Sequence, residues 1–158
     1  MTTHPLSLPL SHRKSIAQDI FWISFGVIAL IAGSEIRIPL PWTPVPITLQ
    51  TFVVVALSLA LPPRRALTAI ALYLLLGGVG VPIFSGWTAG LLRPTTGYLA
   101  GFFLAALALS PLRKKLLTAK WWVGIPATYL INDCIICASG MVWLHFWSDI
   151  PFFQLVWV

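Results

Sequence analysis

Long apolar runs without a charged residue constrain this chain more than any other feature. The first extends from Ile20 to Ser34 and the longest from Ala66 to Leu92. Across the 158 residues, 58% are hydrophobic and only 9% are charged, too few to cover a water-facing surface. Backbone polar groups in lipid must be satisfied by helices or a closed barrel, and continuous runs that do not alternate favour helices. The sequence therefore predicts an all-α integral membrane protein.

The runs predict five complete transmembrane helices and the start of a sixth, in a single membrane domain over residues 1–158. A short cytoplasmic N-terminal tail (1–15) precedes a helical bundle (16–158). The expected helices cover Ile16–Ser34, Ile47–Leu61, Ala66–Val81, Thr96–Pro111 and Trp121–Trp147. The second is short for a bilayer. After Asp149 and Pro151 turn the chain, the closing apolar stretch "FFQLVWV" reads as the beginning of another helix.

The basic residues set the expected orientation. Eight of the ten fall in alternate loops, which predicts that these loops and the N-terminus are cytoplasmic. They are Arg13, Lys14, Arg64, Arg65, Arg113, Lys114, Lys115 and Lys120. Only Arg37 and Arg93 belong to the other loops. The net charge of +6 is therefore a topology signal for a multi-pass protein of the cell (inner) membrane, lying in the lipid bilayer, and no nucleic-acid partner is expected.

A rigid polar loop precedes the second expected helix, in the stretch "PWTPVPITLQTF". Pro41, Pro44 and Pro46 fix φ and remove donors, and a stiff loop loses little entropy when it closes over a ligand. Thr48 and Gln50 follow at the start of the second expected helix, where their uncharged donors and acceptors can point into a cavity. We expect a small-molecule site on the outer side, apolar with a few placed polar groups.

The fifth expected helix carries two chemical candidates. Asp133, next to Asn132, should face the bundle interior with a partner because a carboxylate in the membrane is costly. Asp133 either forms an interhelical hydrogen bond or contacts a substrate or a proton. Cys134 and Cys137 share one helical face as a C-x-x-C pair; we expect buried structural cysteines, with a redox pair or half of a metal site as the alternatives.

Other positions keep two interpretations open. Ala29 and Gly33 form a small-xxx-small pattern that permits close helix approach, either within the chain or against another membrane subunit. Arg93 is either an ordinary interfacial arginine or a bidentate partner for a carboxylate. Trp87, in the glycine-rich "FSGWTAG", is either a lid over a ligand or an aromatic at the membrane interface.

Three stretches together resemble the BioY family, the biotin-binding S components of energy-coupling factor transporters. They are "IPLPWTPVPITLQTFVVVALSLAL", "PRRALTAIALYLLLGGVGVPIFSGWTAGLLRPTTGYLAGF" and, more weakly, "SGMVWLHFW". The resemblance implies six helices, an outward-facing biotin pocket, and a partner module of a transmembrane T component and two cytoplasmic ATPases. It also implies docking of that module through small residues on the first helix, which suits Ala29 and Gly33.

The resemblance implies pocket residues at matching motif positions. These are Gln50, Phe84, Gly86, Gly97 and Tyr98. Trp87 and Arg93 depart from the family's usual residues at their positions and are added as ligand candidates on chemical grounds, as are Thr48 and Asp133. The family's last helix begins with a P-G-D-x-x-K-type motif that contributes to the biotin site, and nothing in this chain matches it.

The sequence holds no catalytic arrangement, nucleotide loop or metal-ligand motif, so we expect neither an enzyme, a cofactor nor a metal. The main expectation is a substrate-capture component of an ATP-driven vitamin importer. Two alternatives are a non-functional truncated transporter fragment and a membrane thiol oxidoreductase that uses Cys134 and Cys137.

Overall fold

A computed structural model describes residues 10–41 and 45–148 of the chain. The predicted start of a sixth helix after Pro151 and the central proline of the stiff loop, Pro44, lie outside the described residues.

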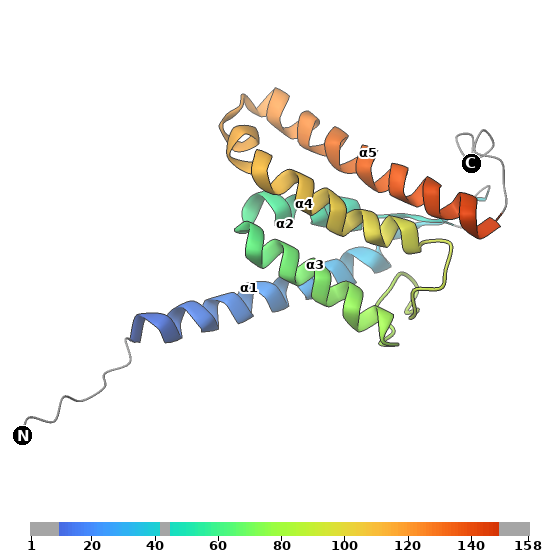
Figure 1. The fold of residues 1–158 in the computed structure, drawn as a ribbon, viewed down its shortest axis with the longest axis horizontal. Coiled ribbons are helices and arrows are strands. Elements are labelled where there is room, and N and C mark those ends of the chain that lie inside the picture. The colour runs from blue at the N-terminus through green and yellow to red at the C-terminus, as the bar shows by residue number, and fades with distance from the viewer. Residues whose placement is uncertain (1–9, 42–44, 149–158) are drawn as a thin grey trace, which may run out of the picture.

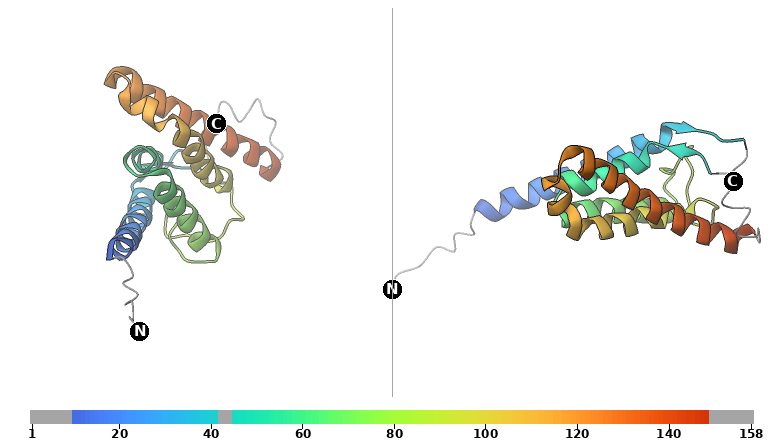
Figure 2. Two further views of the ribbon diagram at one scale, coloured as in Figure 1. Left: turned by 60° about the vertical axis from the view of Figure 1, so that its left-hand side comes forward. Right: turned by 90° about the horizontal axis from the view of Figure 1, so that it is seen from above.

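Five helices and one small hairpin make up the described part of the chain (Figure 1). In order they are α1 (Leu10–Glu35), β1 (Arg37–Ile38), β2 (Ile47–Thr48), α2 (Gln50–Ala60), α3 (Pro63–Gly78), α4 (Thr96–Thr118) and α5 (Trp121–Ser148). The hairpin and the connection 79–95 lie at one end of the bundle, and the α4–α5 turn lies at the other (Figure 2). The two connections that the sequence predicts on the outer side, called the outer connections below, therefore lie at the same end of the bundle.

Two helices extend well beyond their expected bounds, whereas α2 and α3 differ from theirs by at most three residues at either end. α1 begins at Leu10, so it overlaps the predicted tail of residues 1–15. α4 continues through Pro111 to Thr118, so the basic run that was expected in a loop is helical. Arg113 helps to hold this continuation, because its Nε donates to the Leu59 carbonyl at 2.8 Å where α2 ends.

Three of the helices are long and apolar enough to cross a membrane: residues Ile16–Glu35 of α1, then α4 and Trp121–Trp147 of α5. With 11 and 16 residues, α2 and α3 are shorter. At about 1.5 Å per residue they extend about 16 and 24 Å, less than a hydrocarbon core of about 30 Å. The chain is thus a helical membrane protein, and five complete crossings stay a prediction.

The hairpin is a feature that the sequence analysis missed. β1 and β2 are antiparallel, with Arg37 opposite Thr48 and Ile38 opposite Ile47. Thr48 therefore lies on a strand, and the expectation that it begins the second helix is wrong. Strand pairing satisfies backbone groups at both ends of the proline loop, where a helix cannot yet form.

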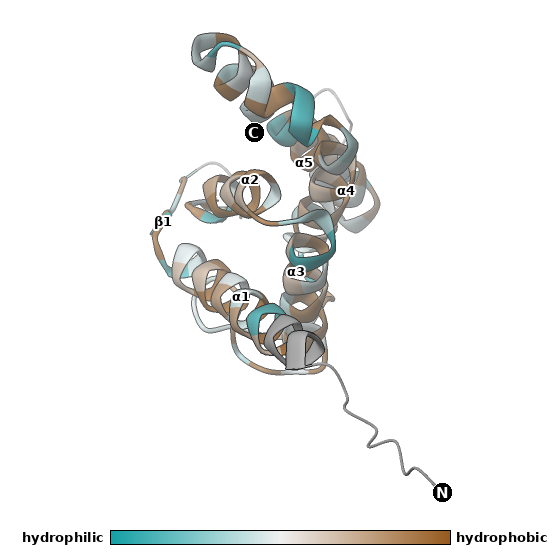
Figure 3. Ribbon diagram, turned by 90° about the vertical axis from the view of Figure 1, so that its left-hand side faces the viewer, coloured by the Kyte–Doolittle hydropathy of each residue, from teal (hydrophilic) through white to brown (hydrophobic). Residues whose placement is uncertain are grey.

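Small residues set the distances between helices. A side chain added at Gly26 in α1 would press on Ala69 of α3, and one at Gly101 in α4 would press on Ile136 of α5. The resulting core includes the fully buried Tyr73. Many large apolar side chains are also exposed, as a lipid environment requires. Figure 3 shows that hydrophobic residues occur along all five helices.

Candidate ligand-binding pocket

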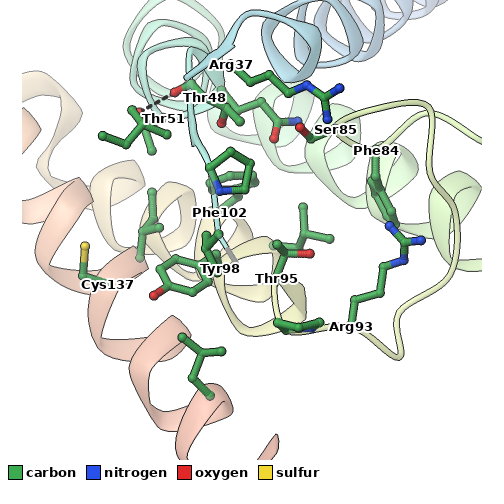
Figure 4. Close-up of a pocket in the computed structure, with 18 of the residues that line it drawn as sticks. Arg37, Thr48, Thr51, Phe84, Ser85, Arg93, Thr95, Tyr98, Phe102 and Cys137 are labelled. Carbon is green, nitrogen blue, oxygen red and sulfur yellow. Dashed lines mark hydrogen bonds between the residues drawn. The ribbon is translucent and has the colours of Figure 1, made fainter. Parts of the chain in front are cut away.

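A cavity of about 770 Å³ lies between the helices and the two outer connections, which supply part of its lining. Its lining comes from α2, α4 and α5, from the hairpin with its loop, and from the connection 79–95 (Figure 4). The volume lies in the range of roughly 300–1,000 Å³ that is usual for small-molecule sites. The space therefore fits a metabolite-sized ligand.

Aromatic and aliphatic side chains form much of the wall, among them Phe84, Tyr98 and Phe102. Phe84 is only 3% exposed and meets Tyr73 edge to face, with 5.3 Å between ring centroids. Its ring packs where Gly77 leaves no side chain, so the glycine pair at the end of α3 positions this wall. Such a surface favours a flat or thioether-containing ring.

Two guanidinium groups enter the cavity from the two connections. Arg37 comes from β1 and Arg93 from the connection 79–95, and Figure 4 shows the Arg93 side chain extending toward Phe84. Within the described residues, neither guanidinium group donates a hydrogen bond to a side chain. Arg is well suited to a carboxylate because it offers a planar fork of donors.

A carboxylate belongs to the same lining. Asp133 reaches the cavity from α5, and its Oδ1 accepts a hydrogen bond from Asn132 Nδ2 at 3.1 Å. Among the described residues, the Asp133 carboxylate therefore has a hydrogen bond only with the adjacent residue, Asn132. No residue of another helix within the described part of the chain forms the hydrogen bond that we predicted. The residue is exposed, not buried in the bundle interior as expected.

Gln50 joins the cavity to the protein core. It is 3% exposed, and its Nε2 donates to the Leu30 carbonyl at 3.1 Å and to the Tyr73 hydroxyl at 2.6 Å. Both amide protons are therefore used inside the protein. Because the residue also lines the cavity, its carbonyl oxygen is the atom that can accept a hydrogen bond from a ligand.

Glu35 ties the two outer connections together. Its Oε1 accepts backbone hydrogen bonds from Gly86 at 3.0 Å and Trp87 at 3.2 Å. Both of these residues have positive φ, 74° and 54°, which turns their N–H groups toward one acceptor. Arg37 packs directly against Gly86 on the same side. The carboxylate thus fixes the connection 79–95 beside the end of α1.

Six of the nine predicted ligand residues line the cavity: Thr48, Gln50, Phe84, Arg93, Tyr98 and Asp133. Gly86, Trp87 and Gly97 do not belong to the lining. Trp87 is 64% exposed and has a positive φ of 54°. Gly86 instead supports Arg37, and Gly97 lies against Trp143 of α5.

Sequence reasoning missed part of the lining. The missed residues include Arg37, Thr51, Ser85, Phe102 and Cys137. Phe102 follows Tyr98 by four positions on α4, so helical spacing could have identified it. Arg37 stood out as one of two basic residues in the outer loops, but its entry into the cavity depends on the hairpin.

The remaining candidates have mixed outcomes. Cys134 and Cys137 are both free and exposed, so the expectation of buried cysteines is wrong; only Cys137 lines the cavity. Gly33 packs against Val53 and the backbone of Gln50, which favours its packing role within the chain. Ala29 is half-buried.

Comparison with known proteins decides the family, because the sequence model described as the BioY family matches residues 3–158. The chain belongs to the BioY family. A protein named biotin transporter BioY from Thermotoga maritima is 36% identical over 121 residues, covering 75% of this chain and 69% of that protein. A probable biotin transporter BioY from Rickettsia prowazekii is 30% identical over 129 residues, covering 80% and 64%. This chain therefore spans about two thirds of each relative's length.

The fold is similar to that of a solved structure, the S component for biotin from an ECF-type ABC transporter. The TM-score is 0.78 at 24% identity, and the match covers 90% of this chain and 79% of that one. Membership of the BioY family supports a transporter subunit over an enzyme, and hence over the thiol oxidoreductase alternative.

Proposed function

We propose that this chain is the biotin-capturing S component of an energy-coupling factor importer in the cell membrane. The observation that carries the proposal is a cavity that combines aromatic walls with the guanidinium groups of Arg37 and Arg93, in a chain of the BioY family. Biotin combines a carboxylate tail with two fused rings, and the cavity offers a complementary group for each part.

The valerate carboxylate binds Arg93, and Arg37 adds positive charge from the other connection. A carboxylate leaves water at a high cost unless a charged partner replaces its hydration. A guanidinium group in a partly desolvated cavity supplies that partner through two parallel hydrogen bonds. Arg93 is therefore the residue that discriminates between a free acid and its ester.

The ring system lies among Phe84, Tyr98 and Phe102. The ureido group then reaches the polar part of the lining, where Gln50 Oε1 and the Asp133 carboxylate can accept its N–H groups and Thr48 can donate to its carbonyl. Each of these contacts uses an atom that the hydrogen bonds described above leave available.

The ligand enters from outside the cell, because the hairpin and the connection 79–95, which supply part of the cavity lining, lie at the end of the bundle opposite the basic C-terminal end of α4 (Figure 1). The positive-inside rule then places those residues and the N-terminus in the cytoplasm. In this proposal each of the five described helices, α1 to α5, crosses the membrane once. A transmembrane T component and two ATPases supply the energy, and Ala29 on α1 offers a small, half-buried surface for docking.

Calorimetric titration of the purified chain in detergent tests the proposal, with biotin, desthiobiotin and thiamine as ligands. Saturable binding that prefers biotin to thiamine is the expected result. Equal or absent binding of all three would contradict it. The variant Arg93→Gln, at a half-buried position in the lining, should weaken biotin binding by about 10- to 150-fold, since a hydrogen bond to a charged group contributes about 1.5–3 kcal/mol.

A further inference from the structure

The indole of Trp143 bonds to the backbone of the loop that carries Arg93. Trp143 Nε1 donates to the Arg93 carbonyl oxygen at 2.8 Å, joining α5 to the connection 79–95 across 50 positions of sequence. The same carbonyl accepts from the Thr96 N–H at 3.2 Å, at the start of α4. Two donors from two helices therefore fix the residue whose side chain enters the cavity.

The local sequence leaves Arg93 in need of such support. Pro94 follows it, and a residue before proline is held out of the helical region, so α4 cannot simply extend back to include it. The preceding Leu91 and Leu92 are exposed and add little packing. The Trp143 hydrogen bond is thus a tertiary contact that determines where the Arg93 backbone lies.

Gly97 makes this contact possible. A side chain at position 97 would overlap the Cβ of Trp143 and the Ser139 carbonyl, so only a glycine lets α5 come this close to the first turn of α4. On the other side, Trp147 stacks on Trp143, with 6.2 Å between ring centroids and 25° between planes. The indole is therefore held from both sides in the orientation that reaches the carbonyl.

We propose that Trp143 is a positioning residue that sets the Arg93 guanidinium for the ligand's carboxylate, and so controls the preference for a free acid. This inference rests on the proposed function, since it concerns how the same site recognises biotin. Trp143 itself does not line the cavity, whereas its neighbour Leu144 does. Its described hydrogen bond to the site is the one to the Arg93 carbonyl.

The test compares biotin with biotin methyl ester, which lacks the anionic oxygen but keeps the rings. Trp143→Phe removes the N–H donor and keeps an aromatic ring. We expect it to reduce the ratio of biotin to ester affinity by about two- to ten-fold, the range of one hydrogen bond, while ester affinity stays within about two-fold. A merely structural role would weaken both ligands together and leave the ratio unchanged, which would overturn the inference.

The matched control is Trp121→Phe. Trp121 is also an indole of α5, at the end of the helix away from Arg93, and within the described residues its N–H donates no hydrogen bond. Its replacement should leave the ratio unchanged. If Trp143→Phe lowers the melting temperature strongly, replacement of Trp143 by benzothienylalanine keeps the two-ring shape and exchanges only the N–H for sulfur. The same fall in the ratio is expected from that isostere, and an unchanged ratio would overturn the inference.

A double-mutant cycle separates positioning from general packing. In the Trp143→Phe background, Arg93→Gln should cost less biotin affinity than in the wild type, because the guanidinium is already misplaced. Fully additive effects would refute coupling between the two residues. Absence of saturable biotin binding by the wild-type chain would instead refute the proposed function, so the two failures are distinct.

Discussion

The amide nitrogen of Gln50 donates a hydrogen bond to the hydroxyl of Tyr73 at 2.6 Å, beneath the floor of the cavity. Gln50 is the polar residue that the sequence marks most strongly as a ligand contact, yet its donors belong to the core. The same side chain therefore contributes both to the stability of α2 against α3 and to the polarity of the pocket.

Because Gln50 has both roles and Tyr73 only the first, substitutions of the two residues should differ in their effect on biotin affinity. Gln50→Ala should lower stability and weaken biotin binding, because the Tyr73 hydroxyl and the Leu30 carbonyl each lose a partner and the ligand loses an acceptor. The loss of stability should be about 1–3 kcal/mol, the cost of leaving buried polar groups unsatisfied. Tyr73→Phe should lower stability similarly and leave affinity nearly unchanged. Thermal unfolding and calorimetry measure both; equal loss of affinity in the two variants would contradict the assignment.

The Glu35 carboxylate should control the order of the connection 79–95. Glu35→Ala leaves the N–H groups of Gly86 and Trp87 without their acceptor, and Trp87 then has less to hold its positive φ. We expect faster amide hydrogen exchange at these two residues and faster release of biotin, by about five-fold or more for a lost charge-assisted bond. Glu35→Gln retains an acceptor oxygen, so its exchange rates and its rate of biotin release should lie between those of the wild type and of Glu35→Ala. Unchanged exchange at both amides would show that the clamp is not what orders the loop.

The glycine pair that ends α3 offers a matched comparison of packing. A Cβ at Gly77 would overlap the ring of Phe84, which is 3% exposed and has nowhere to move. At Gly78 the added atom would meet the end of the Leu91 side chain at 3.0 Å, and Leu91 is exposed and can shift. Gly77→Ala should therefore cost about 1–3 kcal/mol, as overpacking does, and Gly78→Ala under about 1 kcal/mol. Equal melting temperatures would refute the close packing of Phe84.

The sequence was sufficient to predict a helical membrane protein, because long uncharged runs have few other solutions. It also identified Phe84 and Tyr98 in the cavity wall, through motif positions that the resemblance supplied. It could not place Arg37, since the two-residue strands of the hairpin have no periodic signal of their own. Nor could it separate Gly97 from the ligand residues, because a glycine needed for helix contact and one needed for a ligand look alike in sequence.

Cys134 and Cys137 provide an internal test of where the ligand lies, since both are exposed free thiols on α5 but only Cys137 lines the cavity. Bound biotin should cover Cys137 and slow its reaction with a small methanethiosulfonate reagent, by up to about 100-fold at a concentration 100 times Kd, while Cys134 reacts at its usual rate. Single-cysteine variants, Cys134→Ser and Cys137→Ser, separate the two rates by mass spectrometry. Protection of Cys134 as strongly as Cys137 would indicate a global change in the chain and would argue against ligand contact at this cavity.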